Sequence, residues 1–271
     1  MLLVISPAKA LDYDTPVPDD ILQRATRPQW VDESGQLIAL MRERSPAQVA
    51  QLMHLSDALA QLNVARYAAW RPRFGPGNSK PAVLAFNGDV YDGLDARSLS
   101  ADDLDWAQQH LAILSGLHGV LRPLDWLQPY RLEMGTALAG PHGRNLYDFW
   151  GGRIATELDR RCRAAGRTEG AGQADGVIVN LASQEYFRAA RPADLRHRVV
   201  HCQFEDWNKD RYSIISFYAK RARGLMARWA ITRRATRVAD LLDFDLDGYA
   251  LAPQDSTAER LVFRRRLATP G

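Results

Sequence analysis

The stretch Ile113–Thr136, ILSGLHGVLRPLDWLQPYRLEMGT, decides how the rest of the chain is interpreted. It is mostly apolar, so we expect it to be buried, yet it contains Arg122, Asp125, Arg131 and Glu133. An unpaired charge in a protein core costs on the order of several kcal/mol. The four charges therefore predict one of two things: structural ion pairs that fix the fold, or one wall of a polar cleft.

Size and composition indicate an ordinary globular protein. The chain has 271 residues, of which 46% are hydrophobic and 25% charged, which fits one large domain or two small ones. Its two cysteines, Cys162 and Cys202, lie in unrelated contexts, which favours a reducing compartment. No apolar run approaches the roughly 18 residues that a membrane span needs. We therefore expect a cytoplasmic protein with no membrane partner.

The net charge is only +3, but basic residues are concentrated near the C-terminus. The segment from Arg211 to Arg237 contains no Asp or Glu, whereas the first hundred residues are acidic by contrast, for example at Asp12 and Asp14. A basic surface on a nearly neutral protein indicates a polyanionic partner. The alternative is a solvated helix face whose cations pair with the acidic half of the chain.

Apolar runs and helical spacing alternate along the chain and predict a mixed α/β (α+β) fold. We expect strands at 2–6, 82–86, 177–181, 199–204, 212–215, 249–252 and 261–266. We expect helices at 31–44, 46–53, 57–70, 100–109, 146–165 and 216–235. Residues 111–114 fit either a helix or a strand, and loops are expected at 12–28, 71–81 and, rich in glycine, 164–176. Without repeats or a linker, residues 1–271 should form a single domain with a central mixed sheet surrounded by helices.

Polar side chains follow three of these expected strands, where α/β folds commonly assemble their sites. Each alone is more often a turn or a cap, but together they predict one shared cleft. The candidates are Ser6, Lys9, Asn87, Asp89, Tyr91, Ser183 and Glu185, joined by Arg122, Asp125, Tyr130, Arg131 and Glu133 from the central stretch.

Motifs for bound metals, phosphates and nucleophiles are absent from the sequence. There is no GxxxxGK[ST] or GxGxxG loop for phosphates and no GxSxG elbow for a nucleophilic serine. The six histidines show neither HxxxH spacing on a helix nor pairing with cysteine. We expect neither a metal nor a cofactor.

Residues 46–64 have the hydrophobic pattern of a helix-hairpin-helix. Such hairpins bind DNA phosphates through backbone N–H groups at the start of the second helix, without reading sequence. The hairpin itself would comprise His54, Leu55, Ser56 and Asp57, with His54 and Ser56 in place of the usual glycines and Ser56 at the N-cap. A plain αα-hairpin would have the same pattern, so both interpretations stay open.

The basic helix contains YAKRARGLMARW, in which cations are interleaved with aromatic rings. That combination suits a phosphate backbone, with stacking on unpaired bases. The candidate DNA contacts are Lys220, Arg221, Arg223 and Arg228. Since Leu225 and Met226 must pack on the core, some of these cations are expected inside the cleft.

Several long motifs resemble the YaaA family of peroxide-stress proteins. They are SPAK at 6–9, FNGDVYDGL at 86–94, the central stretch, LYDFW at 146–150, NLASQEYF at 180–187 and ISFYAKRARGLMARW at 215–229. The resemblance covers nearly the whole chain. It implies an unusual, family-specific single-domain fold with a positively charged cleft and a helix-hairpin-helix. It also implies a cytoplasmic protein of the hydrogen-peroxide response that limits oxidative DNA damage and unincorporated iron. The implied partner is duplex or branched DNA, bound without sequence specificity in connection with recombination repair.

The carboxylates of the expected cleft do not follow from DNA binding, because they repel phosphate. They favour an alternative, an enzyme such as a glycosylase or lyase that acts on a nucleobase or nucleoside. Its catalytic groups would be Lys9, Asn87, Asp89, Glu133 and Lys220, and a small-molecule ligand would be its partner. Direct sequestration of iron, a third class, lacks the ligand pattern.

Overall fold

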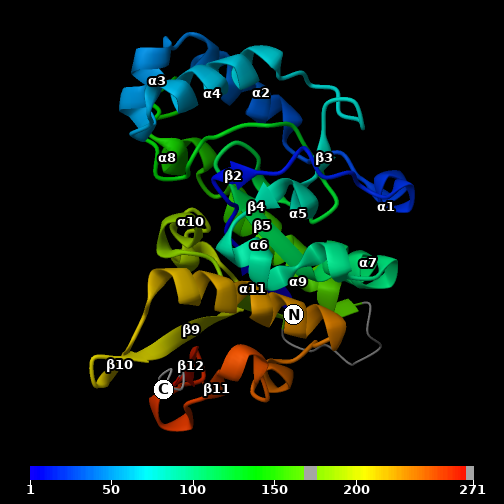
Figure 1. Ribbon diagram of the computed structural model, residues 1–271, viewed down its shortest axis with the longest axis vertical. Helices are drawn as coiled ribbons and strands as arrows, with labels where there is room; N and C mark the ends of the chain where they lie inside the picture. The colour runs from blue at the N-terminus through cyan, green and yellow to red at the C-terminus, as the bar shows by residue number, and fades with distance from the viewer. Residues whose placement is uncertain (168–175, 267–271) are drawn as a thin grey trace.

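The computed structural model of the protein describes residues 1–167 and 176–266. Most of the Gly-rich segment expected at 164–176 therefore lies outside the described residues. A mixed sheet at the centre is surrounded by helices, as Figure 1 shows, which confirms the expected fold class. None of the helices in the described ranges combines the length and apolarity needed to cross a bilayer.

The central sheet has eight strands. In spatial order they are β11 (Ala250–Leu251), β12 (Arg260–Arg265), β9 (Arg198–Asn208), β8 (Val177–Asn180), β1 (Leu2–Ile5), β5 (Leu111–Ser115) and β6 (Gly119–Leu121), with β10 (Arg211–Ser213) paired to β9. The neighbours β12, β9, β8, β1 and β5 are all parallel. Two small antiparallel pairs lie outside it: β2 (Ala10–Leu11) with β4 (Phe86–Asn87), and β3 (Lys80–Pro81) with β7 (Trp126–Leu127).

The order of the strands reverses at β1. The chain runs from β1 to β5 and β6 on one side, then crosses to β8 and β9 on the other side. In open parallel sheets such a switch point leaves a crevice at the carboxyl ends of the two strands, where ligands bind. Here that crevice lies beyond Ile5 of β1 and Asn180 of β8.

The helices are mostly short. They are α1 (Asp19–Arg24), α2 (Val31–Arg42), α3 (Pro46–Met53), α4 (Asp57–Ala69), α5 (Ala82–Ala85), α6 (Asp89–Leu94), α7 (Ala101–His110), α8 (Leu146–Trp150), α9 (Arg153–Arg167), α10 (Gln184–Arg188) and α11 (Ser216–Thr232). Single 3-10 turns are η1 (Ala96–Ser98), η2 (Pro192–Asp194), η3 (Val238–Leu241), η4 (Leu246–Gly248) and η5 (Pro253–Asp255).

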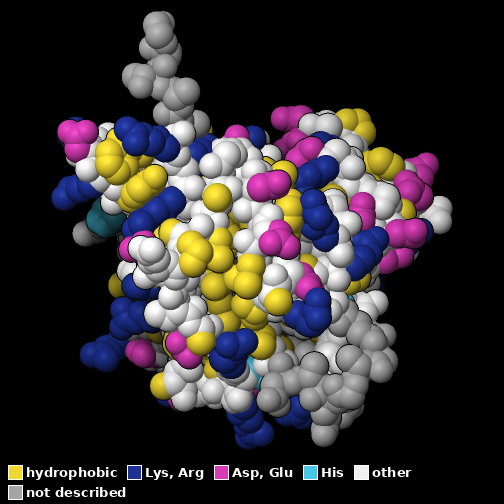
Figure 2. Space-filling view, turned by 90° about the horizontal axis from the view of Figure 1, so that it is seen from below, with side chains coloured by type: hydrophobic (Ala, Val, Ile, Leu, Met, Phe, Trp, Pro, Cys, Tyr) yellow, Lys and Arg dark blue, Asp and Glu magenta, His cyan; other side chains and the backbone are white. Residues whose placement is uncertain are grey.

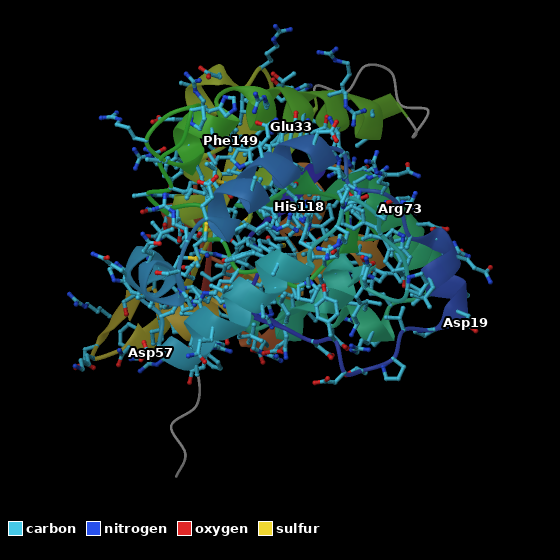
Figure 3. All side chains as sticks on the ribbon, turned by 90° about the horizontal axis from the view of Figure 1, so that it is seen from above. Asp19, Glu33, Asp57, Arg73, His118 and Phe149 are labelled. Carbon is cyan, nitrogen blue, oxygen red and sulfur yellow. The ribbon has the colours of Figure 1, made fainter. Side chains whose placement is uncertain are left out.

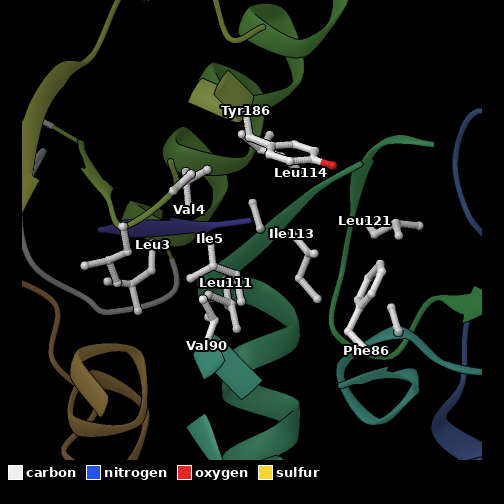
Figure 4. Packing of buried hydrophobic residues seen from close by; sticks show 14 of the residues in the cluster. Leu3, Val4, Ile5, Phe86, Val90, Leu111, Ile113, Leu114, Leu121 and Tyr186 are labelled. Atoms are coloured by element: carbon white, nitrogen blue, oxygen red, sulfur yellow. The ribbon is translucent and has the colours of Figure 1, made fainter. Parts of the chain in front are cut away.

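The hydrophobic core forms around β1 and β5. All four residues of Leu2–Ile5 and all five of Leu111–Ser115 are buried, as expected for central parallel strands covered on both faces. Figure 4 shows Ile5, Ile113 and Leu121 within this cluster, with Phe86 and Val90 packed against it. The central stretch, Ile113–Thr136, thus begins within the β5–β6 hairpin, and residues 111–114 belong to strand β5.

Three expectations about local structure are wrong. Of the strand expected at 82–86, Ala82–Ala85 form a single buried helical turn, α5, and Phe86 begins β4. The N–H groups of Ala82 and Val83 donate to the carbonyls of Asp125 and Pro123 rather than to a sheet. A short apolar run fits a buried helix as well as a strand. The expected loop at 12–28 contains α1, and the expected helix at 146–165 is broken at Gly151, where φ is +51°.

Candidate functional site

One cleft, with a volume of about 450 Å³, opens at the carboxyl ends of β1 and β8. The segment after β1, the turn before α6, the first turn of α10 and one side of α11 form its walls. Of the expected site residues it is lined by Ser6, Lys9, Asn87, Asp89, Ser183, Glu185, Lys220 and Arg223. Four segments far apart in the sequence therefore converge. Two of them follow the parallel strands β1 and β8, as the strand-end argument predicts, whereas Asn87 and Asp89 follow α5 rather than a strand of the central sheet.

Two serines join the walls across the switch point. Ser6 follows β1 and Ser183 caps α10, and the N–H of Ser183 donates to the Ser6 hydroxyl at 2.9 Å. The hydroxyl of Ser183 in turn accepts from the N–H of Tyr186. These bonds fix the distance between the two strand ends and so set the width of the crevice.

The wall formed by α6 and α11 depends on glycine. Gly93 of α6 lies against the backbone of α11 at Arg221, and Gly224 of α11 lies against the backbone of α6 at Val90. Only residues without a side chain allow two helix backbones to approach this closely. Lys220 and Arg223 of the same helix line the cleft, so their positions depend on this contact.

Lys9 and Glu133 form one of two lysine–carboxylate pairs at the cleft. The Lys9 ammonium lies 2.7 Å from Glu133, which also accepts from Arg131 at 2.8 Å. Burial alone would raise the pKa of Glu133, but the hydrogen bonds from Lys9 and Arg131 hold it below its usual range. Glu133 is therefore ionised at neutral pH and acts as an anchor for both cations.

Lys220 and Asp89 form the second pair, and it is looser. Their charged atoms are 3.8 Å apart, beyond the range of a normal hydrogen bond. Glu185, on the opposite wall, accepts the N–H of Gly135 at 2.9 Å. Asp89 therefore keeps acceptor capacity toward the cleft, whereas Glu185 is tied to the central stretch.

Arg223 differs from the other cations of the cleft. Within residues 1–167 and 176–266 it makes no hydrogen bond, ion pair or ring contact, although its side chain is half-buried. Burial lowers the pKa of Arg223, with the Cys202 thiol opposing that shift. A partly desolvated guanidinium without a protein anion is a group that an anionic ligand would stabilise.

Tyr91 and Tyr130, which were also expected in the cleft, do not line it. The hydroxyl of Tyr91 donates to the carbonyl of Ser6 at 3.1 Å, and that of Tyr130 bonds Ser115 at 2.6 Å. Burial raises the pKa of both phenols well above the ordinary value. Both side chains are consequently neutral, and Tyr91 holds the backbone of Ser6 at the end of β1.

Arg122 and Asp125 do not belong to the cleft, which corrects the expectation that they line it. They form an ion pair at 2.8 Å and line a separate cavity of about 220 Å³ with Arg160, Arg161 and Glu157 of α9. Asp125 is buried, and burial raises its pKa against the effect of Arg122. This half of the central stretch holds structural charges. Arg131 and Glu133 do not line the cleft either, but Glu133 pairs with Lys9, which does.

Most cations of the basic segment are paired within the fold. Arg221 contacts Asp247, Arg228 donates to the carbonyls of Leu94 and Asp95, and Arg234 binds Asp103. Viewed from below, basic and acidic side chains are interspersed over the surface (Figure 2). Pairing with the acidic half therefore accounts for much of the charge asymmetry in the sequence.

Residues 46–69 do form two helices joined by a tight turn. His54 ends α3 in the left-handed conformation, with φ +53°, and Ser56 is the N-cap of α4 without a side-chain capping bond. No Lys or Arg occurs from 45 to 65, and Asp57 occupies the first turn of α4. The hairpin lies at the top of Figure 1, away from α11 in the lower half, and Asp57 lies at the outer edge of Figure 3. Its role in DNA binding stays a prediction.

Thiol and metal chemistry receive no support from the site. Cys162 and Cys202 are buried, and burial raises the pKa of the thiols to about 11 and about 12, whereas peroxide reacts with exposed thiolates. No group of three or more His, Cys, Asp or Glu side chains within the described residues is arranged to hold a metal ion.

Two residues near the cleft were not predicted from the sequence. Tyr186 lines it beside Glu185, and its position in the strand-end motif NLASQEYF was the available signal. Phe217 is exposed one turn before Lys220 on α11. Nothing in the sequence distinguishes an exposed phenylalanine from a buried one.

Comparisons with known proteins agree with the motifs. Residues 1–255 match the family model described as peroxide stress protein YaaA. A UPF0246 protein of Delftia acidovorans is 60% identical over 99% of this chain and 100% of its own length. A UPF0246 protein of Paracidovorax citrulli is 58% identical over 98% and 99%. The chain therefore belongs to the family of the peroxide stress protein YaaA.

Proposed function

We propose that the protein binds DNA through the cleft, without reading base sequence, as part of the peroxide response. Arg223 carries this proposal, because it is a half-buried cation that lacks an anionic partner among the described residues. Lys9 and Lys220 add two further cations, so the lining has three cations against the carboxylates of Asp89 and Glu185. A phosphate group in the cleft would neutralise the excess positive charge.

The cleft accounts better for DNA contact than the hairpin at residues 46–64 does. Affinity for DNA comes mainly from cations that neutralise phosphates, and the hairpin has none. Its contribution would be limited to backbone N–H groups at the start of α4, next to the carboxylate of Asp57. Few neutralised phosphates also imply a moderate salt dependence. In a plot of log binding constant against log salt concentration, the slope should be negative and no steeper than about −3.

Replacing Arg223 tests the proposal. We expect Arg223→Gln to bind a short duplex about tenfold more weakly at about 0.1 M salt, and to reduce the salt slope by about one, because one phosphate contact is lost. Fluorescence anisotropy measures both quantities. Arg233→Gln is the matched control, since it removes the same charge from an exposed side chain that rests on Trp229.

The free energy of unfolding of Arg223→Gln shows whether a loss of DNA affinity comes from a lost contact or from a damaged fold. Removing an unpaired, partly desolvated charge should leave the free energy of unfolding of Arg223→Gln unchanged or higher. Equal affinities for the wild type and Arg223→Gln would contradict the proposal, and so would a loss of affinity that merely follows a loss of stability.

A second function, catalysis on a nucleobase or nucleoside, is favoured by one observation. Two lysine–carboxylate pairs, Lys9–Glu133 and Lys220–Asp89, lie at the same cleft. A lysine beside a carboxylate supplies a nucleophile or an acid–base pair. Glu133 is ionised and doubly paired, so Asp89 is the stronger candidate for proton transfer.

Conservative amide variants distinguish catalysis from binding alone. If the cleft is catalytic, Asp89→Asn should abolish protection of cells from peroxide while DNA affinity stays equal or rises, because a repulsive charge is removed. Glu133→Gln should release Lys9 and lower protection less. Full protection by cells carrying Asp89→Asn would exclude Asp89 as a catalytic residue.

A further inference from the structure

Five large apolar side chains are exposed among the described residues, and two of them flank the start of α11. The five are Leu59, Leu62, Ile214, Phe217 and Leu242. Phe217 is the most exposed, at 57%, and Ile214 follows at 54%. An aromatic ring that stays in water forgoes most of the hydrophobic free energy that burial provides. Core packing therefore does not explain Phe217.

Phe217 is not part of the cleft lining, but it lies on the same helix as two cations that are. Phe217 precedes Lys220 by three residues on α11, which puts the two side chains on the same side of the helix. Lys220 and, one turn further on, Arg223 line the cleft. The Tyr218 ring, whose centroid is 5.4 Å from that of Phe217, supports it from one side. An aromatic face is thus placed beside the cations that would hold a phosphate.

The surroundings favour a nucleobase over a protein as the occupant. Phe217 is followed on α11 by Lys220 and Arg223, which line the cleft together with Asp89 and Glu185. An apolar protein partner would need a larger continuous patch than Ile214 and Phe217 offer. A base that stacks on a ring while its phosphate meets a neighbouring cation is the usual pattern of contact with unpaired nucleic acid. Intact duplex hides the faces of its bases within the stack.

We infer that Phe217 is a stacking platform for an unstacked base, and that the cleft consequently prefers DNA with an unpaired or displaced nucleotide over intact duplex. This inference rests on the proposed DNA-binding function and names the class of DNA that the site selects. Phe217 contributes the stacked face, and Lys220 with Arg223 contributes the phosphate contact.

The test compares a fully paired duplex with the same duplex containing a two-nucleotide bulge. By anisotropy at fixed salt, we expect the wild type to bind the bulged DNA about tenfold more tightly. Phe217→Ala should bind the paired duplex like the wild type and lose the preference, whereas Phe217→Trp should keep it. Leu62→Ala, which truncates an exposed apolar side chain on α4, is the control and should keep it too. The fluorescence of a 2-aminopurine base placed in the bulge should be quenched on binding to the wild type and to Phe217→Trp, because the base stacks on the ring. It should not be quenched by Phe217→Ala.

The outcomes separate the inference from the function on which it rests. No affinity of the wild type for either DNA would overturn both. Equal affinity for both DNAs, or a preference that survives in Phe217→Ala, would overturn the stacking role alone. If Phe217→Ala instead converts a dimer into a monomer in light scattering without changing the preference, the exposed ring is a contact between copies of the chain and the inference is wrong.

Discussion

Gly224→Ala should destabilise the protein by about 3 kcal/mol and lower its Tm by about 8 °C. A Cβ atom at this position would lie 1.8 Å from the carbonyl oxygen of Val90, far inside contact distance, and the obstructing atom is backbone that no rotamer change removes. The helices α6 and α11 would have to separate. Gly93→Ala should have a similar effect, because its Cβ would lie 2.1 Å from the carbonyl oxygen of Arg221.

Separation of α6 from α11 would also open the wall that positions Lys220 and Arg223. DNA affinity should therefore fall in Gly224→Ala even where the variant is still folded, and urea denaturation with anisotropy on the same samples measures both effects. Gly152→Ala is the matched control, since nothing lies within 4 Å of its Cβ position. A Gly224→Ala protein as stable as Gly152→Ala would show that the two helices do not pack as described.

Mild acid should destabilise the protein strongly, with a loss of about 2 kcal/mol from each of two buried histidines between about pH 7.5 and pH 5. Burial lowers the pKa of His118 to about 3 and that of His110 to about 4, from 6.5. Both are neutral in the folded state, whereas the unfolded chain takes up protons below about pH 6.5. The contribution of the two neutral histidines to the free energy of unfolding is therefore fully present above that pH. It is lost as the pH drops toward the folded pKa values.

The structure suggests a variant that isolates His118. Its Nδ1 bonds the Ser34 hydroxyl at 2.9 Å, while Nε2 is buried without a partner among the described atoms. Figure 3 shows His118 well inside the molecule, surrounded by other side chains. In His118→Asn the amide replaces Nδ1, so the difference in unfolding free energy between the two pH values should shrink by about 2 kcal/mol. His54→Asn, at an exposed position, should leave the difference as it is. An unchanged difference in His118→Asn would exclude His118 as a source of the acid sensitivity.

The sequence predicted the site better than it predicted the fold's details. Strand ends are marked by apolar runs followed by polar residues, so the convergence of Lys9 and Ser183 followed from the rule that parallel strands end at one edge. Asn87 also lines the cleft, but it follows the helical turn α5 and not a parallel strand. The helices α3 and α7 were likewise predicted, and each begins with a capping box at a serine, which is a local feature.

Features that depend on distant contacts could not be predicted. The charges of Arg122 and Arg131 look alike in the sequence. Arg122 pairs with Asp125 beside α9, whereas Arg131 shares Glu133 with Lys9 of the cleft. The cations of α11 look uniformly available, but Arg228 and Arg234 meet partners more than a hundred residues away. The turn at Ala82–Ala85 became helical because its N–H groups found acceptors in the central stretch. In each case the deciding partner lies far along the chain.

The central claim, that DNA occupies the crevice at the carboxyl ends of β1 and β8, is tested most directly by amide hydrogen exchange with and without a short duplex. The account predicts slower exchange in Ser6–Ala10 and Ser183–Tyr186, which line the crevice from opposite strands. It also predicts little change in the hairpin between α3 and α4, where no Lys or Arg is present. Protection confined to that hairpin, with both crevice segments unchanged at saturating DNA, would contradict it.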